Sequence, residues 1–126
     1  MRIATVALVV RDYDEAIGFY VEKLGFELIA DTPLGAGKRW VLVSPQGGDA
    51  RLLLAQAGDE EEASRIGNQT GGRVGFFLET EDFAGDFARF TANGVKFLEA
   101  PRHEPYGSVA VFEDLYGNKW DLIQPK

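Results

Sequence analysis

Residues 3–20 read IATVALVVRDYDEAIGFY, and this stretch decides the fold. Its first eight residues are apolar or β-branched, which predicts a buried strand over 3–10. Asp12 follows, and Glu15 stands three residues later in the pattern that begins a capped helix. Gly25 suits the left-handed position that ends a helix. Between these two ends, apolar side chains recur at helical spacing at Tyr13, Ala16, Ile17, Tyr20 and Leu24.

Three more strands are predicted after this helix. Short β-rich runs follow at 26–32, 38–44 and 50–57. Proline and glycine in 32–35 and again in 45–49 favour turns between these runs. Residues 1–57 are therefore predicted to form one strand-helix-three-strand module.

The chain repeats this module at an offset of 68 residues. Val6 is matched by Val74, and Asp14 by Asp82, with one residue of slippage where Gly25 meets Gly94. The second module, 73–126, is predicted to contain a strand at 73–79, a helix capped by Thr80 and closed by Asn93-Gly94, and strands at 95–100, 107–113 and 118–124. A polar linker, 58–72, joins the modules, and Asp59 is predicted to cap a short helix within it.

The length, composition and net charge of the chain limit the kinds of molecule that we expect it to bind. The 126 residues, 45% of them hydrophobic, suffice for one domain built from the two modules. The net charge of −7 and the lack of any cluster of Lys and Arg argue against a nucleic-acid partner. The chain has no cysteine, and the apolar run at 3–10 is too short to span a membrane. We therefore expect a cytoplasmic protein that makes no membrane contact.

The repeated module, together with the phrase KLGF at 23–26 and the closing run DLYGNKWDLIQP at 114–125, resembles the vicinal oxygen chelate superfamily. That superfamily includes glyoxalase I, extradiol dioxygenases and bleomycin-resistance proteins. The resemblance covers essentially the whole chain. It implies an α+β fold of two βαβββ modules whose mixed sheets curve around a cavity. Several chemistries share this scaffold, so the resemblance does not by itself decide the function.

The superfamily usually holds a divalent metal ion with ligands from the first and last strands of each module. Carried over residue by residue, those positions are Thr5, Leu53, Arg73 and Asp121. Leu53 has no lone pair, and the fixed positive charge of Arg73 would repel a cation, so only Asp121 suits the ion. The single histidine, His103, is predicted to lie between two strands, away from these positions. We therefore expect no metal and no other cofactor, the alternative being a divalent metal ion.

Strand alternation counted from Asp121 predicts which side chains face the cavity. It places Val109 and Val111 beneath the helices, as it does Val41 and Val43, and Phe112 on the cavity side. The predicted ligand contacts are Thr5, Trp40, Leu53, Arg73, Phe77, Tyr106, Phe112 and Asp121. Two roles are open for Arg73 and Asp121. They form an ion pair with each other in place of the metal ion, or they bind the ligand.

Two classes of function follow from the resemblance and from these residues. The first is a protein that binds a small, partly aromatic molecule in an apolar cavity without the metal centre, as bleomycin-resistance proteins do. The second is a glyoxalase-type lyase or isomerase, or a dioxygenase-like enzyme, with an atypical or metal-free site in which Asp121 is the catalytic base. A homodimer is expected in either case, because a partner subunit commonly completes the half-closed sheets of this family.

Overall fold

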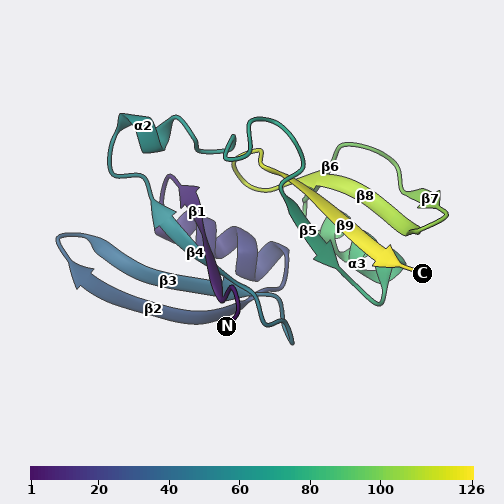
Figure 1. Ribbon diagram of the computed structural model, residues 1–126, viewed down its shortest axis with the longest axis horizontal. Coiled ribbons are helices and arrows are strands. Elements are labelled where there is room, and N and C mark those ends of the chain that lie inside the picture. The colour runs from purple at the N-terminus through teal and green to yellow at the C-terminus, as the bar shows by residue number, and fades with distance from the viewer. The chain divides into compact units, whose positions relative to one another are not determined.

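The apolar run near the start of the chain forms strand β1 (Thr5–Val10), and a helix follows it at once. The structure is a computed structural model that describes residues 1–126. The chain divides into two compact units, and the boundary between them falls inside the predicted linker 58–72. We call Met1–Gly67 unit 1 and Asn68–Lys126 unit 2. Each unit has a mixed sheet with helices, which confirms the predicted α+β class (Figure 1).

Unit 1 contains a four-stranded sheet in the order β1-β4-β3-β2. Its remaining elements are α1 (Tyr13–Ile17), the π-helical turn η1 (Gly18–Lys23), β2 (Glu27–Gly35), β3 (Lys38–Ser44), β4 (Arg51–Gln56) and α2 (Glu60–Ala63). Strands β1 and β4 run parallel, whereas the other neighbours run antiparallel. The turn predicted at 32–35 is wrong, because β2 continues to Gly35. The chain reverses at Ala36-Gly37, where φ is +53° and +78°, as a two-residue hairpin turn requires.

Helix α1 begins as its sequence predicts. The Asp12 side chain accepts a hydrogen bond from the backbone N–H of Glu15 at 2.9 Å. The helix contacts β3 and β4, and the strand residues that alternate toward it are fully buried. This core contains Leu8, Val10, Val41, Val43 and Leu54. The predicted short helix after the last strand is also confirmed, because Asp59 caps α2 by accepting from the N–H of Glu62 at 2.8 Å.

Unit 2 contains a sheet in the order β5-β9-β8-β6, and a short strand, β7, also pairs with β8. The elements of unit 2 are β5 (Phe76–Glu79), α3 (Phe83–Ala92), β6 (Lys96–Phe97), β7 (Arg102–Glu104), β8 (Gly107–Glu113) and β9 (Lys119–Pro125). The N-cap predicted at Thr80 is wrong, because Asp82 caps α3 by accepting from the N–H of Gly85 at 3.1 Å. The hydroxyl of Thr80 instead accepts from the backbone N–H of Asp82, the capping residue itself.

An aromatic cluster forms the core of unit 2 beneath α3. Phe90 of α3 meets Phe112 of β8 edge-on, with ring centroids 5.5 Å apart, and Phe112 stacks on Trp120 of β9 at 5.8 Å. Phe97 and Phe76 extend the cluster to β6 and β5. Aromatic contacts of this kind add free energy beyond the area that they bury. The cluster therefore fixes α3 and four strands as one packing unit.

The number of residues that separates corresponding positions of the two units is not constant along the chain. The helix caps Asp12 and Asp82 are 70 residues apart, the helix-ending Gly25 and Gly94 are 69 apart, and the paired last strands correspond at 68. Unit 1 has one residue more than unit 2 in the π-helical turn η1, which unit 2 lacks. Unit 1 has a second additional residue in the turn before β4. The offset of 68 thus holds only for β4 and β9.

No helix of the chain combines the length and the apolar character that crossing a membrane would demand.

Candidate functional site

The sheet of unit 1 has one face away from α1, and aromatic and aliphatic side chains gather there. Leu53 of β4 is in register with Ala7 of β1 and with Leu42 of β3, so these three share that face. Trp40 shares it by alternation with Leu42, and 44% of its surface is exposed. Thr5 shares it by alternation with Ala7 and is half-buried. The structure thus brings Thr5, Trp40 and Leu53 onto one face, as the sequence predicts.

The sheet of unit 2 has a corresponding face away from α3, which we call the open face of unit 2. Asp121 lies on the central strand β9, between Phe77 of β5 and Val111 of β8, each in register with it. Phe77 is 60% exposed, whereas Asp121 and Val111 are half-buried. Figure 1 shows β5, β9 and β8 side by side in this order. Phe77 and Asp121 are therefore neighbours on one sheet face, which agrees with the prediction that both point to the same side.

The predicted parity of β8 is wrong. Val111, not Phe112, is in register with Asp121, so Phe112 points to the opposite side, where it packs against Phe90 and is fully buried. The cause is the changing offset: β8 corresponds to β3 at 69 residues, and a shift of one residue moves every side chain of a strand to the other face. Phe112 is a core residue, and Val109 and Val111 belong to the open face.

Arg73 does not meet Asp121. It precedes β5, its side chain is exposed, and its Nε donates to the backbone carbonyl of Val74 at 2.9 Å. The position equivalent to Thr5 is Gly75, because each stands seven residues before its helix cap. A Cβ on Gly75 would clash with the side chain of Thr70, whose hydroxyl donates to the carbonyl of Arg73 at 2.7 Å. The structure thus separates two residues that were predicted to lie together.

Asp121 has an unusual electrostatic environment. Its Oδ1 atom is buried and has no hydrogen-bond partner. Burial raises the pKa of the carboxyl, the positive charge of Arg102 opposes this shift, and the negative charge of Glu99 adds to it. Arg102 is already engaged, because its Nε donates to both carboxylate oxygens of Glu99, at 3.1 and 2.8 Å. The carboxyl of Asp121 therefore has unused capacity to accept a hydrogen bond.

A hollow of about 320 Å³ lies beside Asp121 on the same unit. Val111, in register with Asp121, and Lys119, two residues before it on β9, both line the hollow. Its other lining residues are Gly72, Val74, Leu98 and Glu99. Lys119 was not among the residues predicted from the sequence, although its parity with Asp121 would have found it. Leu98 and Glu99 fall within the strand predicted at 95–100, which is wrong beyond Phe97: they lie between β6 and β7, so alternation along that predicted strand could not place them.

Tyr106 and His103 lie at the hairpin that joins β7 to β8. Tyr106 is 54% exposed in the turn, and its carbonyl accepts from the backbone N–H of Lys126 at 3.0 Å. His103 is on β7 rather than between strands, and its Nδ1 lies 2.9 Å from the hydroxyl of Ser108. The register of β7 and β8 puts His103 and Ser108 on the side opposite Asp121. His103 therefore takes no part in the open face.

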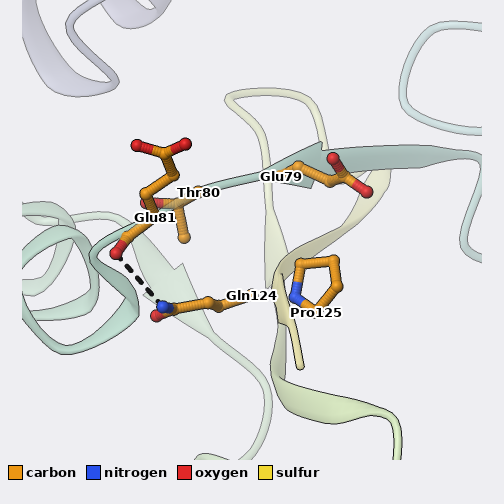
Figure 2. A pocket seen from close by; sticks show the side chains of 5 residues that line it. All are labelled: Glu79, Thr80, Glu81, Gln124 and Pro125. Atoms are coloured by element: carbon orange, nitrogen blue, oxygen red, sulfur yellow. Dashed lines mark hydrogen bonds between the residues drawn. The ribbon is translucent and has the colours of Figure 1, made fainter.

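A second hollow, of about 420 Å³, lies at the ends of β5 and β9 (Figure 2). Figure 2 shows the Gln124 side chain directed at the backbone carbonyl of Glu81, to which its Nε2 donates at 3.1 Å. The Oε1 atom of Gln124 accepts from the backbone N–H of Phe83 at 2.9 Å. Both ends of the amide are thus engaged in holding the start of α3. This arrangement indicates a structural clamp rather than a binding site.

The residues at the family's usual ligand positions do not fit a metal ion. With Gly75 in place of Arg73, two of the four positions, Leu53 and Gly75, have no donor atom in the side chain, and Thr5 offers only a neutral hydroxyl. Asp121 alone offers a carboxylate. No group of three or more His, Cys, Asp or Glu side chains is placed to hold a metal ion. We therefore derive no chemical step through a metal.

Comparison with protein families gives one match over nearly the full chain. The sequence model of the Glyoxalase/Bleomycin resistance protein/Dioxygenase superfamily matches residues 2–122. A protein of Shewanella frigidimarina (strain NCIMB 400) is 56% identical over 124 residues, which are 97% of this chain and 92% of that protein. Sequence and length thus agree with a single superfamily unit.

Two solved structures extend the comparison. UcmS2 superposes with a TM-score of 0.86 and is 34% identical, with 98% of this chain and 97% of that chain covered. TnmS3, described as an antibiotic binding protein from Streptomyces sp. CB03234, has a TM-score of 0.79 and is also 34% identical, with 100% and 97% covered. The whole chain therefore has the architecture of these proteins.

Proposed function

The chain belongs to the glyoxalase/bleomycin resistance protein/dioxygenase superfamily, and on that premise we propose that it binds a small, partly aromatic molecule without a metal ion. The observation that carries this proposal is that each unit, taken by itself, offers an exposed aromatic ring on the helix-free face of its sheet: Trp40 in unit 1 and Phe77 in unit 2. Exposed aromatic rings offer a large contact area at a small entropic cost. The likeness to TnmS3, an antibiotic binding protein, supports this class of ligand.

The polar contacts of the proposed ligand come from few groups. Asp121 stands beside Phe77 with an unpartnered buried oxygen, and Thr5 offers a hydroxyl on the face that carries Trp40 and Leu53. Small-molecule sites typically combine an apolar lining with a small number of placed polar groups. Arg73 and Tyr106 are exposed, so each is accessible to a ligand at the margin of unit 2. We propose these residues as secondary contacts.

Replacing Trp40 or Phe77 with alanine is expected to weaken ligand binding roughly tenfold each, because an aromatic contact contributes about 1–2 kcal/mol. Thermal-shift screening of the purified protein against aromatic antibiotics selects the ligand, and isothermal titration calorimetry then measures the affinity. Leu115→Ala is the matched control, since Leu115 is 43% exposed in the turn after β8 and is not part of a sheet. A screen in which no aromatic compound raises the melting temperature would contradict the proposal.

A glyoxalase-type lyase or isomerase is the second candidate, and the carboxyl of Asp121 favours it. Burial raises the pKa of this carboxyl, and its Oδ1 atom has no partner within the chain, as a group that exchanges a proton with a substrate requires. Such an enzyme would turn over a hemithioacetal without added metal, and Asp121→Asn would abolish the turnover. A binding protein would show the antibiotic-induced thermal shift and no turnover.

We also propose that the protein is a homodimer. Strand β1 is at an edge of the sheet of unit 1, and exposed apolar side chains lie on it or just before it, at Ile3 (83% exposed) and Val6 (49% exposed). Exposed apolar edges favour pairing with another chain. Light scattering at micromolar concentration is expected to give twice the chain mass of 13.9 kDa. A mass equal to that of the single chain would contradict the proposal.

A further inference from the structure

The Oδ1 atom of Asp121 is buried without a hydrogen bond, and no neighbouring group offsets the free-energy cost of burying it. The atom accepts none, although a carboxylate can accept several hydrogen bonds. A buried polar atom without a partner typically lowers the free energy of unfolding, and in native proteins such atoms are few. Asparagine or leucine would avoid the buried charge at this position. The carboxylate therefore points to a partner that arrives from outside the chain.

The cationic side chains near Asp121 do not supply that partner. Arg102 donates through Nε to Glu99 and through Nη1 to Glu104 at 3.2 Å, so its charge is already shared between two carboxylates. Lys119 lies on the same strand face and lines the hollow, but it makes no hydrogen bond to Oδ1. Arg102 and Lys119 together balance the charges of Glu99 and Glu104, so the carboxylate of Asp121 is itself the unbalanced negative charge among these side chains. A cationic donor matches these surroundings.

We propose that Asp121 binds a protonated amine of the ligand while the aromatic part of the same molecule packs against Phe77. This inference rests on the proposed function and names the ligand class: an aromatic molecule with an alkylammonium group one or two bonds from the ring. Neighbouring strands of a sheet lie about 4.8 Å apart, and Phe77 and Asp121 are in register across β5 and β9, so one small molecule reaches both side chains. The hollow of about 320 Å³ is lined by Val111 and Lys119, the neighbours of Asp121 on the same face.

An ammonium group fits better than a neutral hydroxyl or a metal ion. A hydrogen bond from an ammonium to a carboxylate is charge-assisted and about twice as strong as a neutral one. A divalent ion requires several anionic or imidazole ligands, and Asp121 has no such companions, whereas a single ammonium is neutralised by a single carboxylate. The net charge of −7 also favours the approach of a cation.

The test uses two fragments that differ only in this group, 1-naphthylmethylamine and 1-naphthylmethanol. Each is titrated into the full-length ¹⁵N-labelled protein, and its affinity is measured from amide chemical shifts. The amine is expected to bind about 10- to 100-fold more tightly than the alcohol, as a hydrogen bond to a charged group provides. Asp121→Asn is expected to lower the affinity for the amine to the level of the affinity for the alcohol. Urea unfolding checks that this variant is no less stable than the parent protein.

Glu79→Gln is the matched control for net charge. Glu79 is exposed on β5, on the same sheet face as Asp121, and is in register with Ile123 rather than with Asp121. This variant loses the same charge and is expected to keep the preference for the amine. If Glu79→Gln reduced the preference for the amine over the alcohol as much as Asp121→Asn did, the preference would come from the overall negative charge and not from a contact with Asp121. The proposal would then be wrong.

The outcomes separate this inference from the proposed function. Equal affinities for amine and alcohol, or an amine affinity unaffected by Asp121→Asn, would overturn the role of Asp121 and leave aromatic-ligand binding intact. Absence of amine binding at millimolar concentration would also overturn it. If the antibiotic screen found no ligand as well, both proposals would fail together.

Discussion

Replacing Asp114 with alanine is expected to lower the free energy of unfolding by about 3–5 kcal/mol. The carboxylate is buried in the turn between β8 and β9. Its Oδ1 accepts from the backbone N–H groups of Tyr116, Gly117 and Asn118 at 3.0, 3.1 and 2.9 Å. Its Oδ2 accepts from the side chains of Asn118 at 3.0 Å and Trp120 at 3.4 Å. Alanine removes all five of these hydrogen bonds at once. Urea denaturation followed by circular dichroism measures the loss.

The Asp114 turn also holds the start of unit 2. The Oδ1 atom of Asn118 accepts from the backbone N–H of Gln69 at 3.2 Å, so loss of Asp114 releases the segment before β5 as well. Asp12→Ala is the control, because Asp12 is an exposed helix cap, and its loss is expected to cost only about 1 kcal/mol. Equal losses for the two variants would show that the Asp114 network adds nothing beyond a single cap.

Replacing Phe112 with alanine is expected to lower the free energy of unfolding by about 3–5 kcal/mol. The ring is fully buried and contacts Phe90, Phe97 and Trp120, so its removal leaves a cavity that these large neighbours cannot easily fill. Urea denaturation measures the change, and the loss of near-ultraviolet circular dichroism reports the disturbed aromatic cluster.

Phe77→Ala is the matched control for Phe112→Ala. Phe77 is 60% exposed on the opposite face of the same sheet, so its loss is expected to change the free energy of unfolding by less than about 1 kcal/mol. The two variants are thus expected to have opposite effects: Phe112→Ala lowers the stability of the fold, whereas Phe77→Ala weakens ligand binding. A stable Phe112→Ala protein with weakened ligand binding would restore Phe112 to the ligand-facing set and contradict the register of β8.

Local signals in the sequence predicted most elements of the fold. Asp12 and Asp59 cap the helices as expected, because an N-cap depends only on a side chain and the N–H groups within the next turn. Thr80 misled the prediction for the same reason, since Asp82, two residues later, is an equally good cap and is the one used. The hairpin turn at Ala36-Gly37 was placed too early, because Pro33 is tolerated in the edge strand β2.

The predictions of site residues that failed come from segments where the repeat offset is not 68. Asp121 and Leu53 come from the strands that correspond at 68 residues, and Phe77 has the right parity, so all three lie on the helix-free faces. Phe112 and Arg73 come from segments where the offset is 69 or 70, and both were misplaced. Glu99 and Arg102, which set the electrostatics of Asp121, lie beside strands too short to show alternation.

The sequence by itself determined the two repeated units and the cap of the first helix, because periodicity and turn chemistry act over a few residues, and its resemblance to the superfamily indicated the family. Only the tertiary structure decided which residues share a face. The sheet register depends on pairing between distant strands, and one extra residue in the π-helical turn η1 or in the loop before β4 reverses the parity of the next strands. That register separates Arg73 from Asp121, buries Phe112, and leaves the Asp121 carboxyl beside Phe77 without a partner of its own.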